Sequence, residues 1–173
     1  MNIETRRLTL EDYDDLKESM EQAYDTLGGQ IWSKHTIEKL LNLFPEGQLC
    51  IAVDNKVVAC SLSIIVDYDE YGDKHTYRLI TGEYTFSTHD PTGDTLYGIE
   101  IFVSPEYRGL RLGRRLYEAR KELCETLNLK SIIAGGRIPG YHPHPDTMTP
   151  REYIDKVKAK ELYDPTLTFQ LSN

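Results

Sequence analysis

Residues 103–113, which read VSPEYRGLRLG, contain a turn whose residue types suit the binding of a phosphate group. The turn joins an apolar stretch, residues 96–103, to a segment with the hydrophobic spacing of an amphipathic helix. The first amides of such a helix lack intrahelical acceptors and lie at the positive end of its dipole, so they can bind an anion. Arg108 adds a positive charge, and Gly109 and Gly113 let the backbone approach a ligand because they have no Cβ. The alternative is an ordinary strand, turn and surface helix.

One carboxylate, Glu100, interrupts the apolar run before this turn. It lies three residues before Val103, where a carboxylate can accept a proton directly or through water. Because Glu is disfavoured inside apolar strands, two interpretations stand equally: a functional carboxylate, or a side chain that faces solvent or pairs with an Arg. His89 is a second candidate base, although a lone His beside a turn is more typical of a structural residue.

The rest of the sequence alternates helical and strand patterns in the order of one mixed α/β domain spanning residues 1–173. Ser33 and Thr149 are predicted to cap helices, and Asp54 and Asn55 to form a hairpin turn. The helix after the phosphate-binding turn is predicted from the spacing of Leu112, Leu116, Ala119, Leu123 and Leu127. The other expected helices are residues 13–27, 33–44 and 149–162, and the expected strands are residues 6–10, 49–53, 57–66, 77–86, 96–103 and 130–134.

Composition predicts a compact soluble domain in the cytoplasm. The chain has 173 residues, of which 39% are hydrophobic, and a net charge of −8, which argues against nucleic acid as a partner. It contains neither a signal peptide nor an apolar run of about 18 residues, so no membrane association is expected. Cys50, Cys60 and Cys124 lack the paired spacing of zinc sites and disulfides, which predicts core residues. Residues 142–146 (HPHPD) are predicted to be a loop, and no metal is expected.

The phosphate-binding turn resembles the acyl-CoA signature of the GNAT superfamily of acetyl-CoA-dependent N-acyltransferases. That signature is Arg or Gln, two residues, Gly, one residue, then Gly or Ala. Arg108 and Gly113 match its ends, and Arg111 stands where the middle Gly would be. Residues 135–141 (GGRIPGY), 149–157 and 163–173 resemble the GNAT domain that is fused ahead of nitrilase-type carbon-nitrogen hydrolases. In GNAT domains a Gly-Phe and further strands would follow, so the chain is expected to lack the last strands.

The resemblance implies a mixed, largely antiparallel central sheet flanked by helices, with acetyl-CoA as co-substrate. It implies transfer of an acetyl group to a primary amine by direct attack in a ternary complex. Deprotonating an amine with a pKa near 10.4 costs roughly 4 to 5 kcal/mol at pH 7, so Glu100 is the first candidate for a general base. The amide near Val103 would polarise the thioester, and the general acid would be Tyr141, Tyr163 or water. The implied cofactor-binding residues are Ile101, Phe102, Val103, Arg108, Gly109, Leu110, Arg111, Leu112, Gly113 and Arg114.

Two other functions fit the same residues. One is a non-catalytic acyl-CoA-binding module that regulates a fused carbon-nitrogen hydrolase, and the other is an anion-binding α/β domain without CoA specificity. The expected partner is a small-molecule or peptide amine. A bare sheet edge near residues 131–134 would also favour a homodimer.

Overall fold

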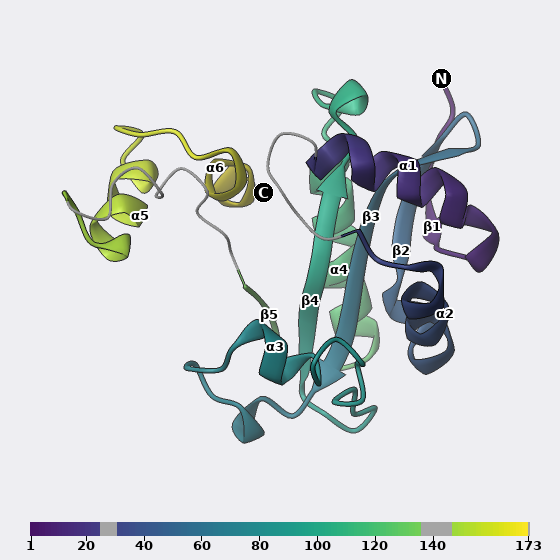
Figure 1. The fold of residues 1–173 in the computed structure, drawn as a ribbon, viewed down its shortest axis with the longest axis horizontal. Coiled ribbons are helices and arrows are strands. Elements are labelled where there is room, and N and C mark those ends of the chain that lie inside the picture. Colours follow the sequence, from purple (N-terminus) through teal and green to yellow (C-terminus); the bar gives the residue numbers. More distant parts are fainter. Residues whose placement is uncertain (25–30, 136–146, 173) are drawn as a thin grey trace. The chain divides into compact units, whose positions relative to one another are not determined.

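The computed structural model describes residues 1–24, 31–135 and 147–172, and its first 134 residues contain a five-stranded sheet (Figure 1). The strands lie in the order β1-β2-β3-β4-β5. Three strand pairs are antiparallel, and β5 runs parallel to β4. This arrangement confirms the predicted α/β class with a mixed, largely antiparallel sheet. The strands are Ile3–Arg7 (β1), Leu49–Val53 (β2), Lys56–Val66 (β3), Thr95–Val103 (β4) and Ser131–Ala134 (β5).

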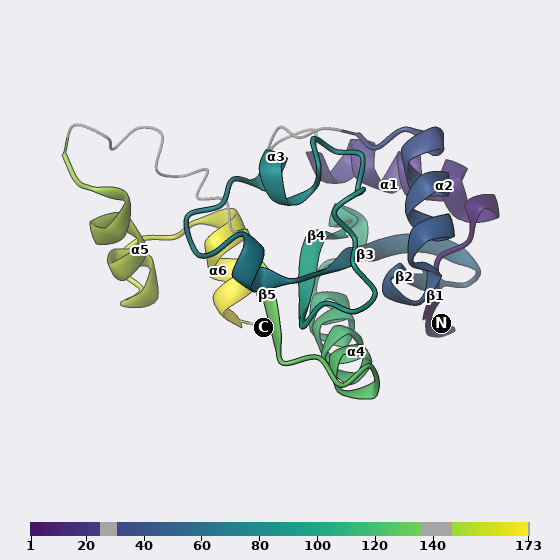
Figure 2. The same ribbon diagram turned by 90° about the horizontal axis from the view of Figure 1, so that it is seen from below.

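Helices cover both faces of this sheet, and Figure 2 shows α1 and α2 on one face and α4 on the other. Leu16 of α1 and Ile37 of α2 join one hydrophobic core with Leu62 of β3, whereas Leu116 of α4 packs in another with Val58. Within the described ranges, no helix has both the length and the apolar character needed to span a bilayer. The helices of this unit are Tyr13–Tyr24 (α1), Lys34–Leu43 (α2), Tyr77–Ile80 (α3) and Leu112–Thr126 (α4), with 3-10 turns at Leu10–Asp12, Pro45–Gly47, Tyr68–Glu70 and Pro105–Tyr107.

Two local signals have the predicted structure. The Ser33 hydroxyl accepts a hydrogen bond from the Thr36 amide at 3.2 Å and so caps α2. Asp54 and Asn55, with φ angles of 49° and 70°, connect β2 to β3. Positive φ at both central positions is the geometry of the two-residue turn that matches the twist of a hairpin.

The strand predicted at residues 77–86 is wrong. Thr76 caps the short helix α3 by accepting a hydrogen bond from the Leu79 amide at 3.1 Å. Past α3, the φ angles of Gly82, Tyr84 and Phe86 are 62°, 67° and 59°, which no β-strand contains. The segment has the β-branched and aromatic residues of a strand. Phe86, however, is buried in the core on the α1 and α2 face of the sheet and is not paired within the sheet.

Two strand boundaries also differ from the prediction. The first strand was predicted at residues 6–10 but spans Ile3–Arg7, because Leu10–Asp12 forms a 3-10 turn. The strand predicted as buried at residues 130–134 exists as Ser131–Ala134, but it is half-buried to exposed. Among the described residues, β5 has a neighbouring strand on its β4 side and none on its other side, which explains its exposure.

Residues Gly135–Asn173 form a second compact unit. It contains α5 (Pro150–Lys158), which ends before the predicted residue 162, and α6 (Pro165–Ser172), which was not predicted. The Thr149 hydroxyl accepts from the Glu152 amide at 3.2 Å, as the predicted cap requires. Asp164 connects the two helices, because its carboxylate accepts from the Tyr153 hydroxyl at 2.6 Å and from the Leu167 amide at 2.8 Å. A single domain over 173 residues stays a prediction.

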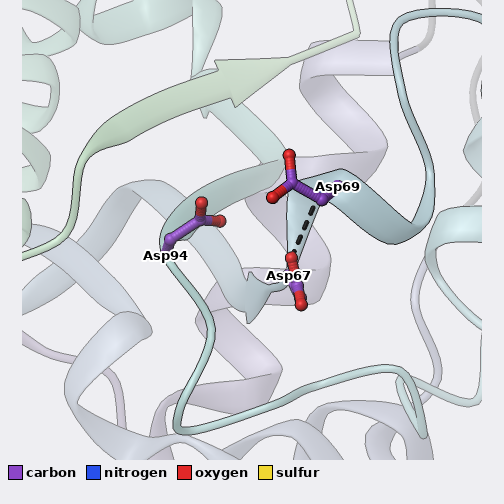
Figure 3. Close-up of side chains that lie close together, drawn as sticks. All are labelled: Asp67, Asp69 and Asp94. Carbon is purple, nitrogen blue, oxygen red and sulfur yellow. Dashed lines mark hydrogen bonds between the residues drawn. The ribbon is translucent and has the colours of Figure 1, made fainter.

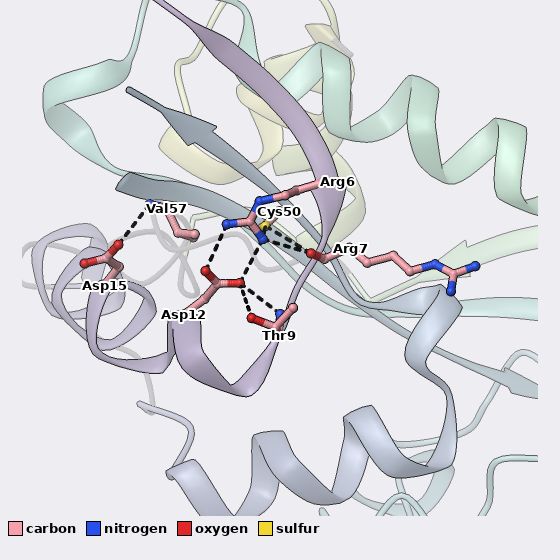
Figure 4. Close-up of polar contacts among 7 residues, drawn as sticks. All are labelled: Arg6, Arg7, Thr9, Asp12, Asp15, Cys50 and Val57. Atoms are coloured by element: carbon pink, nitrogen blue, oxygen red, sulfur yellow. Dashed lines mark hydrogen bonds and ion pairs between the residues drawn. The ribbon is translucent and has the colours of Figure 1, made fainter. Parts of the chain in front are cut away.

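A bidentate ion pair joins β1 to the 3-10 turn that precedes α1 (Figure 4). Arg6 Nη1 lies 2.8 Å from Asp12 Oδ2, and Arg6 Nη2 lies 2.9 Å from Asp12 Oδ1. The Thr9 amide also donates to Asp12 Oδ2 at 2.9 Å. The hydrogen bonds from Arg6 hold the pKa of the Asp12 carboxyl below its ordinary value.

We expect Asp12→Asn to lower the free energy of unfolding by about 1.5 to 3 kcal/mol at pH 7, the range for hydrogen bonds to charged groups. Because the folded pKa is depressed, the ion pair stabilises the protein above the ordinary pKa of 3.8 and is lost as pH falls through the folded value. Urea unfolding at pH 7 and pH 3 should show that the difference in the free energy of unfolding between variant and wild type is smaller at low pH. The exposed Asp14→Asn is the control, and a gap that is independent of pH would contradict the prediction.

Candidate functional site

The predicted phosphate-binding turn lies between β4 and α4. Arg108, Gly109 and Leu110 are exposed, and Gly113 is buried in the first turn of α4. The N-cap residue Arg111 makes no capping hydrogen bond with its side chain, in contrast to Ser33 at the start of α2. Among the described residues, the first amides of α4 are therefore not occupied by a side-chain cap. Free amides beside an exposed Arg are what an anion requires at a helix N-terminus.

The backbone of this turn explains why the family signature has glycines here. Gly109 has a φ of 90°, and Arg111 has a φ of 57° and a ψ of 31°, the left-handed region. A residue other than Gly is strained there by roughly 1 to 2 kcal/mol. The departure from the signature at Arg111 is thus a side chain placed on backbone that suits glycine.

We expect Arg111→Gly to raise the free energy of unfolding by up to about 1 kcal/mol, because relief of the left-handed strain outweighs the greater freedom of Gly in the unfolded chain. Gly109→Ala is the converse variant: no atom lies within 4 Å of the added Cβ, so its expected destabilisation comes from the backbone alone. Chemical denaturation measures both. A destabilised Arg111→Gly protein would show that the Arg111 side chain contributes contacts that exceed the strain.

Strand β4 contains a bulge immediately before the turn. Leu62 of β3 pairs with Glu100 and the next residue, Ser63, pairs with Gly98, so Ile99 is an extra residue in β4. A bulge places two successive side chains on the same side of a strand and redirects those that follow. Ile99 belongs to the core on the α1 and α2 face, and the Glu100 carboxylate is also on that face, where its Oε2 accepts from Trp32 Nε1 at 3.2 Å. Without the extra residue, strand alternation would direct Glu100 toward α4.

The bulge also marks the point at which β5 stops pairing with β4. Their parallel pairing runs from Thr95 to Gly98, opposite Ser131 to Ala134. From Ile99 to Val103, strand β4 has a strand neighbour on the β3 side only, within the part of the chain that the structure describes. The predicted ligand-contacting residues Ile101, Phe102 and Val103 lie in this stretch, half-buried or buried. Residues 99–113 therefore contain an unpaired strand edge, the Glu100 carboxylate and the uncapped start of α4.

Sequence reasoning missed the aromatic residues around Glu100. Trp32, which is 6% exposed, packs against Phe86 and Tyr84 with ring centroids 5.7 and 6.4 Å apart. The Tyr77 hydroxyl donates to the carbonyl of the bulged Ile99 at 3.1 Å. The sequence offered one signal, because Trp32 is the only tryptophan of the chain and precedes a predicted helix cap.

The buried face of α4 also differs from the prediction. Its buried residues recur every four positions as Leu112, Leu116, Arg120 and Cys124, with Gly113 beside them. Of the residues predicted for this face, Leu127 is exposed at the end of the helix. Arg120 is thus a core residue that the apolar pattern did not include. It is a second residue that sequence reasoning missed.

The other predicted candidates lie in several settings. His89 stacks on Phe44, and its Nδ1 accepts from the Ile65 amide at 3.0 Å, so it fixes a turn; burial lowers its pKa. Tyr163 is 74% exposed in the second unit, and Tyr141 and residues 142–146 lie outside the described residues.

The three cysteines are buried and free, as predicted for core residues. Burial raises the pKa of each thiol, to about 12 for Cys50. A thiol with a raised pKa is a poor nucleophile near neutral pH, because the thiolate is the reactive form.

Three carboxylates, those of Asp67, Asp69 and Asp94, gather at the ends of β3 and β4 (Figure 3). Their nearest oxygens lie within 4.8 Å of one another. Asp67 Oδ1 accepts from the Asp69 amide at 3.2 Å, and Asp94 Oδ1 accepts from the Tyr68 amide at 3.2 Å. This amide holds the pKa of Asp94 below its ordinary value. These hydrogen bonds organise the loop and account for the grouping of the carboxylates without a ligand.

Comparison with known proteins gives a family and several relatives. The family model described as "Acetyltransferase (GNAT) family" matches residues 13–139. In Bacillus subtilis (strain 168), "Probable hydrolase YhcX" is 45% identical over 146 residues, which cover 84% of this chain and 28% of that protein. "Uncharacterized N-acetyltransferase YkwB" from the same organism is 31% identical over 141 residues, 82% of this chain and 62% of that protein. The chain therefore spans less than two thirds of each of these relatives.

Solved structures share the fold at low sequence identity. The loading GNATL domain of CurA from Lyngbya majuscula has a TM-score of 0.78 and 21% identity, covering 99% of this chain and 83% of that chain. The GphF GNAT-like decarboxylase, solved in complex with isobutyryl-CoA, has a TM-score of 0.75 and 16% identity, covering 98% of this chain and 84% of that chain. Likeness at such identities concerns the fold alone.

Proposed function

We propose that this chain, which belongs to the acetyltransferase (GNAT) family, transfers an acetyl group from acetyl-CoA to a primary amine in a ternary complex. Family membership gives acyl transfer in general, and the acetyl donor and the amine acceptor are our inference. The observation that carries it is the continuous run from the bulged strand β4, through an exposed turn, to the uncapped N-terminus of α4. We further propose that the acceptor is a small-molecule or peptide amine in the cytoplasm.

In this proposal, the turn binds the pyrophosphate of the donor. The backbone amides of residues 109–113 would donate to its oxygens, and the exposed Arg108 and Arg114 would balance its charge. The acyl-bearing arm would follow residues 101–103, along the part of β4 that β5 leaves unpaired. The Val103 amide would then polarise the thioester carbonyl, as the family resemblance implies.

Glu100 would serve as the general base. An ammonium group must lose a proton before its nitrogen can attack, and the bulge directs the Glu100 carboxylate to the α1 and α2 face. The amine nitrogen would bond to the thioester carbon, the carbon-sulfur bond would break, and the second proton of the nitrogen would pass to the CoA thiolate through water. A thiolate is a weak base, with an ordinary pKa of about 8.5, so it departs with little help.

The test is release of the CoA thiol from acetyl-CoA with a panel of primary amines. Amine-dependent thiol release, with the acetylated amine found by mass spectrometry, would support the proposal. Tight binding of acetyl-CoA without turnover on any amine would overturn it.

A specific observation favours one alternative, an acyl-CoA-binding module within a longer hydrolase. The relative with 45% identity is named a probable hydrolase, and the matched segment is 28% of its length. Under this alternative, acyl-CoA binds without turnover and alters the activity of a neighbouring hydrolase domain. The amine panel separates the two functions, because only the enzyme consumes acetyl-CoA.

A further inference from the structure

A buried arginine on α4 lies against the strand that carries Glu100. Arg120 is 3% exposed, and burial lowers its pKa. Its Nη2 donates to two backbone carbonyls, that of Leu62 at 3.2 Å and that of Glu100 at 3.0 Å. Its Nε has no hydrogen-bond partner within the described part of the chain.

These two carbonyls belong to the residue pair at the edge of the bulge. Leu62 and Glu100 are the last regular partners before Ile99 interrupts the ladder between β3 and β4. A bulge disrupts the ladder locally, and buried carbonyls there need other donors. One guanidinium nitrogen bridges the two strands at that point and thereby stabilises the irregular register.

Gly98 of β4 leaves the space that the Arg120 guanidinium occupies. A Cβ added at Gly98 would lie 2.7 Å from Arg120 Nη1 and 3.0 Å from its Cζ. Any side chain at position 98 would therefore displace the guanidinium. Gly98 and Arg120 form a complementary pair on the α4 face, directly behind the bulge.

An ordinary packing role does not explain this arginine well. Burying a charge carries a large desolvation penalty, and replacing a buried charged group with an apolar residue of similar volume is often neutral or stabilising. The neighbours of Arg120 along the buried stripe, Leu116 and Cys124, are apolar. What the guanidinium provides, and an apolar side chain does not, is donors for the bulge that directs Glu100 toward Trp32.

We propose that Arg120 is a positioning residue that holds the β4 bulge in register and so keeps the Glu100 carboxylate on the α1 and α2 face. Its effect on turnover rests on the proposed function, but its effect on Glu100 does not. Trp32, the only tryptophan, reports on this placement because its indole donates to Glu100. Its fluorescence can therefore be measured whether or not the protein acylates an amine.

The first experiment compares Trp32 emission in folded wild type, Glu100→Ala, Arg120→Met, Arg120→Lys and Lys121→Met. Lys121 is the neighbouring exposed cation on α4 and is the matched control. We expect Arg120→Met to shift the emission in the same direction as Glu100→Ala, Arg120→Lys to shift it partly, and Lys121→Met to leave it unchanged. If Arg120→Met does not unfold cooperatively, Arg120→Lys decides. Wild-type emission in the folded Arg120 variants would overturn the proposal.

The second experiment is a double-mutant cycle in kcat. We expect Arg120→Lys to lower kcat by the order of 100-fold, the effect of a misplaced reacting group, with the Kd for acetyl-CoA unchanged. In a Glu100→Ala background, Arg120→Lys should cause no further loss, because no carboxylate is left to position. Additive losses, or an unchanged kcat in Arg120→Lys, would overturn the role in turnover. If the wild type acylates no amine, the proposed function fails, and the emission experiment still decides whether Arg120 positions Glu100.

Discussion

Glu100→Gln is expected to lower kcat for amine acetylation by about 10²- to 10⁴-fold, the usual contribution of a general base. Gln has nearly the same shape as Glu, and its amide oxygen can still accept the Trp32 hydrogen bond, so the fold and the bulge should remain. Only the ability to take the ammonium proton is lost. The Kd for acetyl-CoA should be unchanged, because the expected donor contacts begin one residue later, at Ile101.

Steady-state thiol release and calorimetric binding measure these two effects separately. Glu118→Gln, an exposed change of the same kind on α4, is the control. An unchanged kcat would remove Glu100 from the mechanism and leave water or another group as the proton acceptor.

Gly113→Asp is expected to abolish the stabilisation of the protein by acetyl-CoA. At a hundred times the dissociation constant, a ligand that binds only the folded state stabilises it by about 2.7 kcal/mol. The Asp carboxylate would stand in the first turn of α4, where the pyrophosphate is expected, and would repel it. Thermal unfolding with and without acetyl-CoA measures the loss.

Gly113 is buried, so this variant will also be less stable without ligand. Arg108→Glu tests the same site on exposed backbone, where the fold should not change. We expect it to reduce the acetyl-CoA shift, whereas Lys121→Glu, with the same change of charge elsewhere on α4, should retain it. A full shift in both Gly113→Asp and Arg108→Glu would mean that acetyl-CoA binds elsewhere or through other groups.

Features fixed by neighbouring residues could be predicted from the sequence. The caps at Ser33 and Thr149 and the turn at Asp54 and Asn55 depend on side-chain and backbone chemistry within three residues, and all three formed as predicted. The phosphate-binding turn belongs to the same class, because its glycine, arginine and helix start are contiguous. Its use by acetyl-CoA remains a prediction.

Predictions failed where local preference competed with packing over long distances. Residues 77–86 have strand-forming side chains, but Phe86 lies in the core against Trp32, and the chain takes left-handed backbone to place it there. Apolar spacing on α4 gave a stripe without Arg120, because a periodicity argument assigns charged residues to solvent. The acceptors of Arg120 lie on β3 and β4, 58 and 20 residues away.

By itself, the sequence of this protein determined the order of most elements, the turn that suits phosphate and the carboxylate that precedes it, since these follow from spacing along the chain. Only the tertiary structure decided which way Glu100 faces. That choice depends on one extra residue in the ladder between β3 and β4, on an arginine from α4 and on a tryptophan 68 residues away. A strand's side chains change faces with a shift of one residue, so the orientation of Glu100 is set by pairing and packing between distant segments.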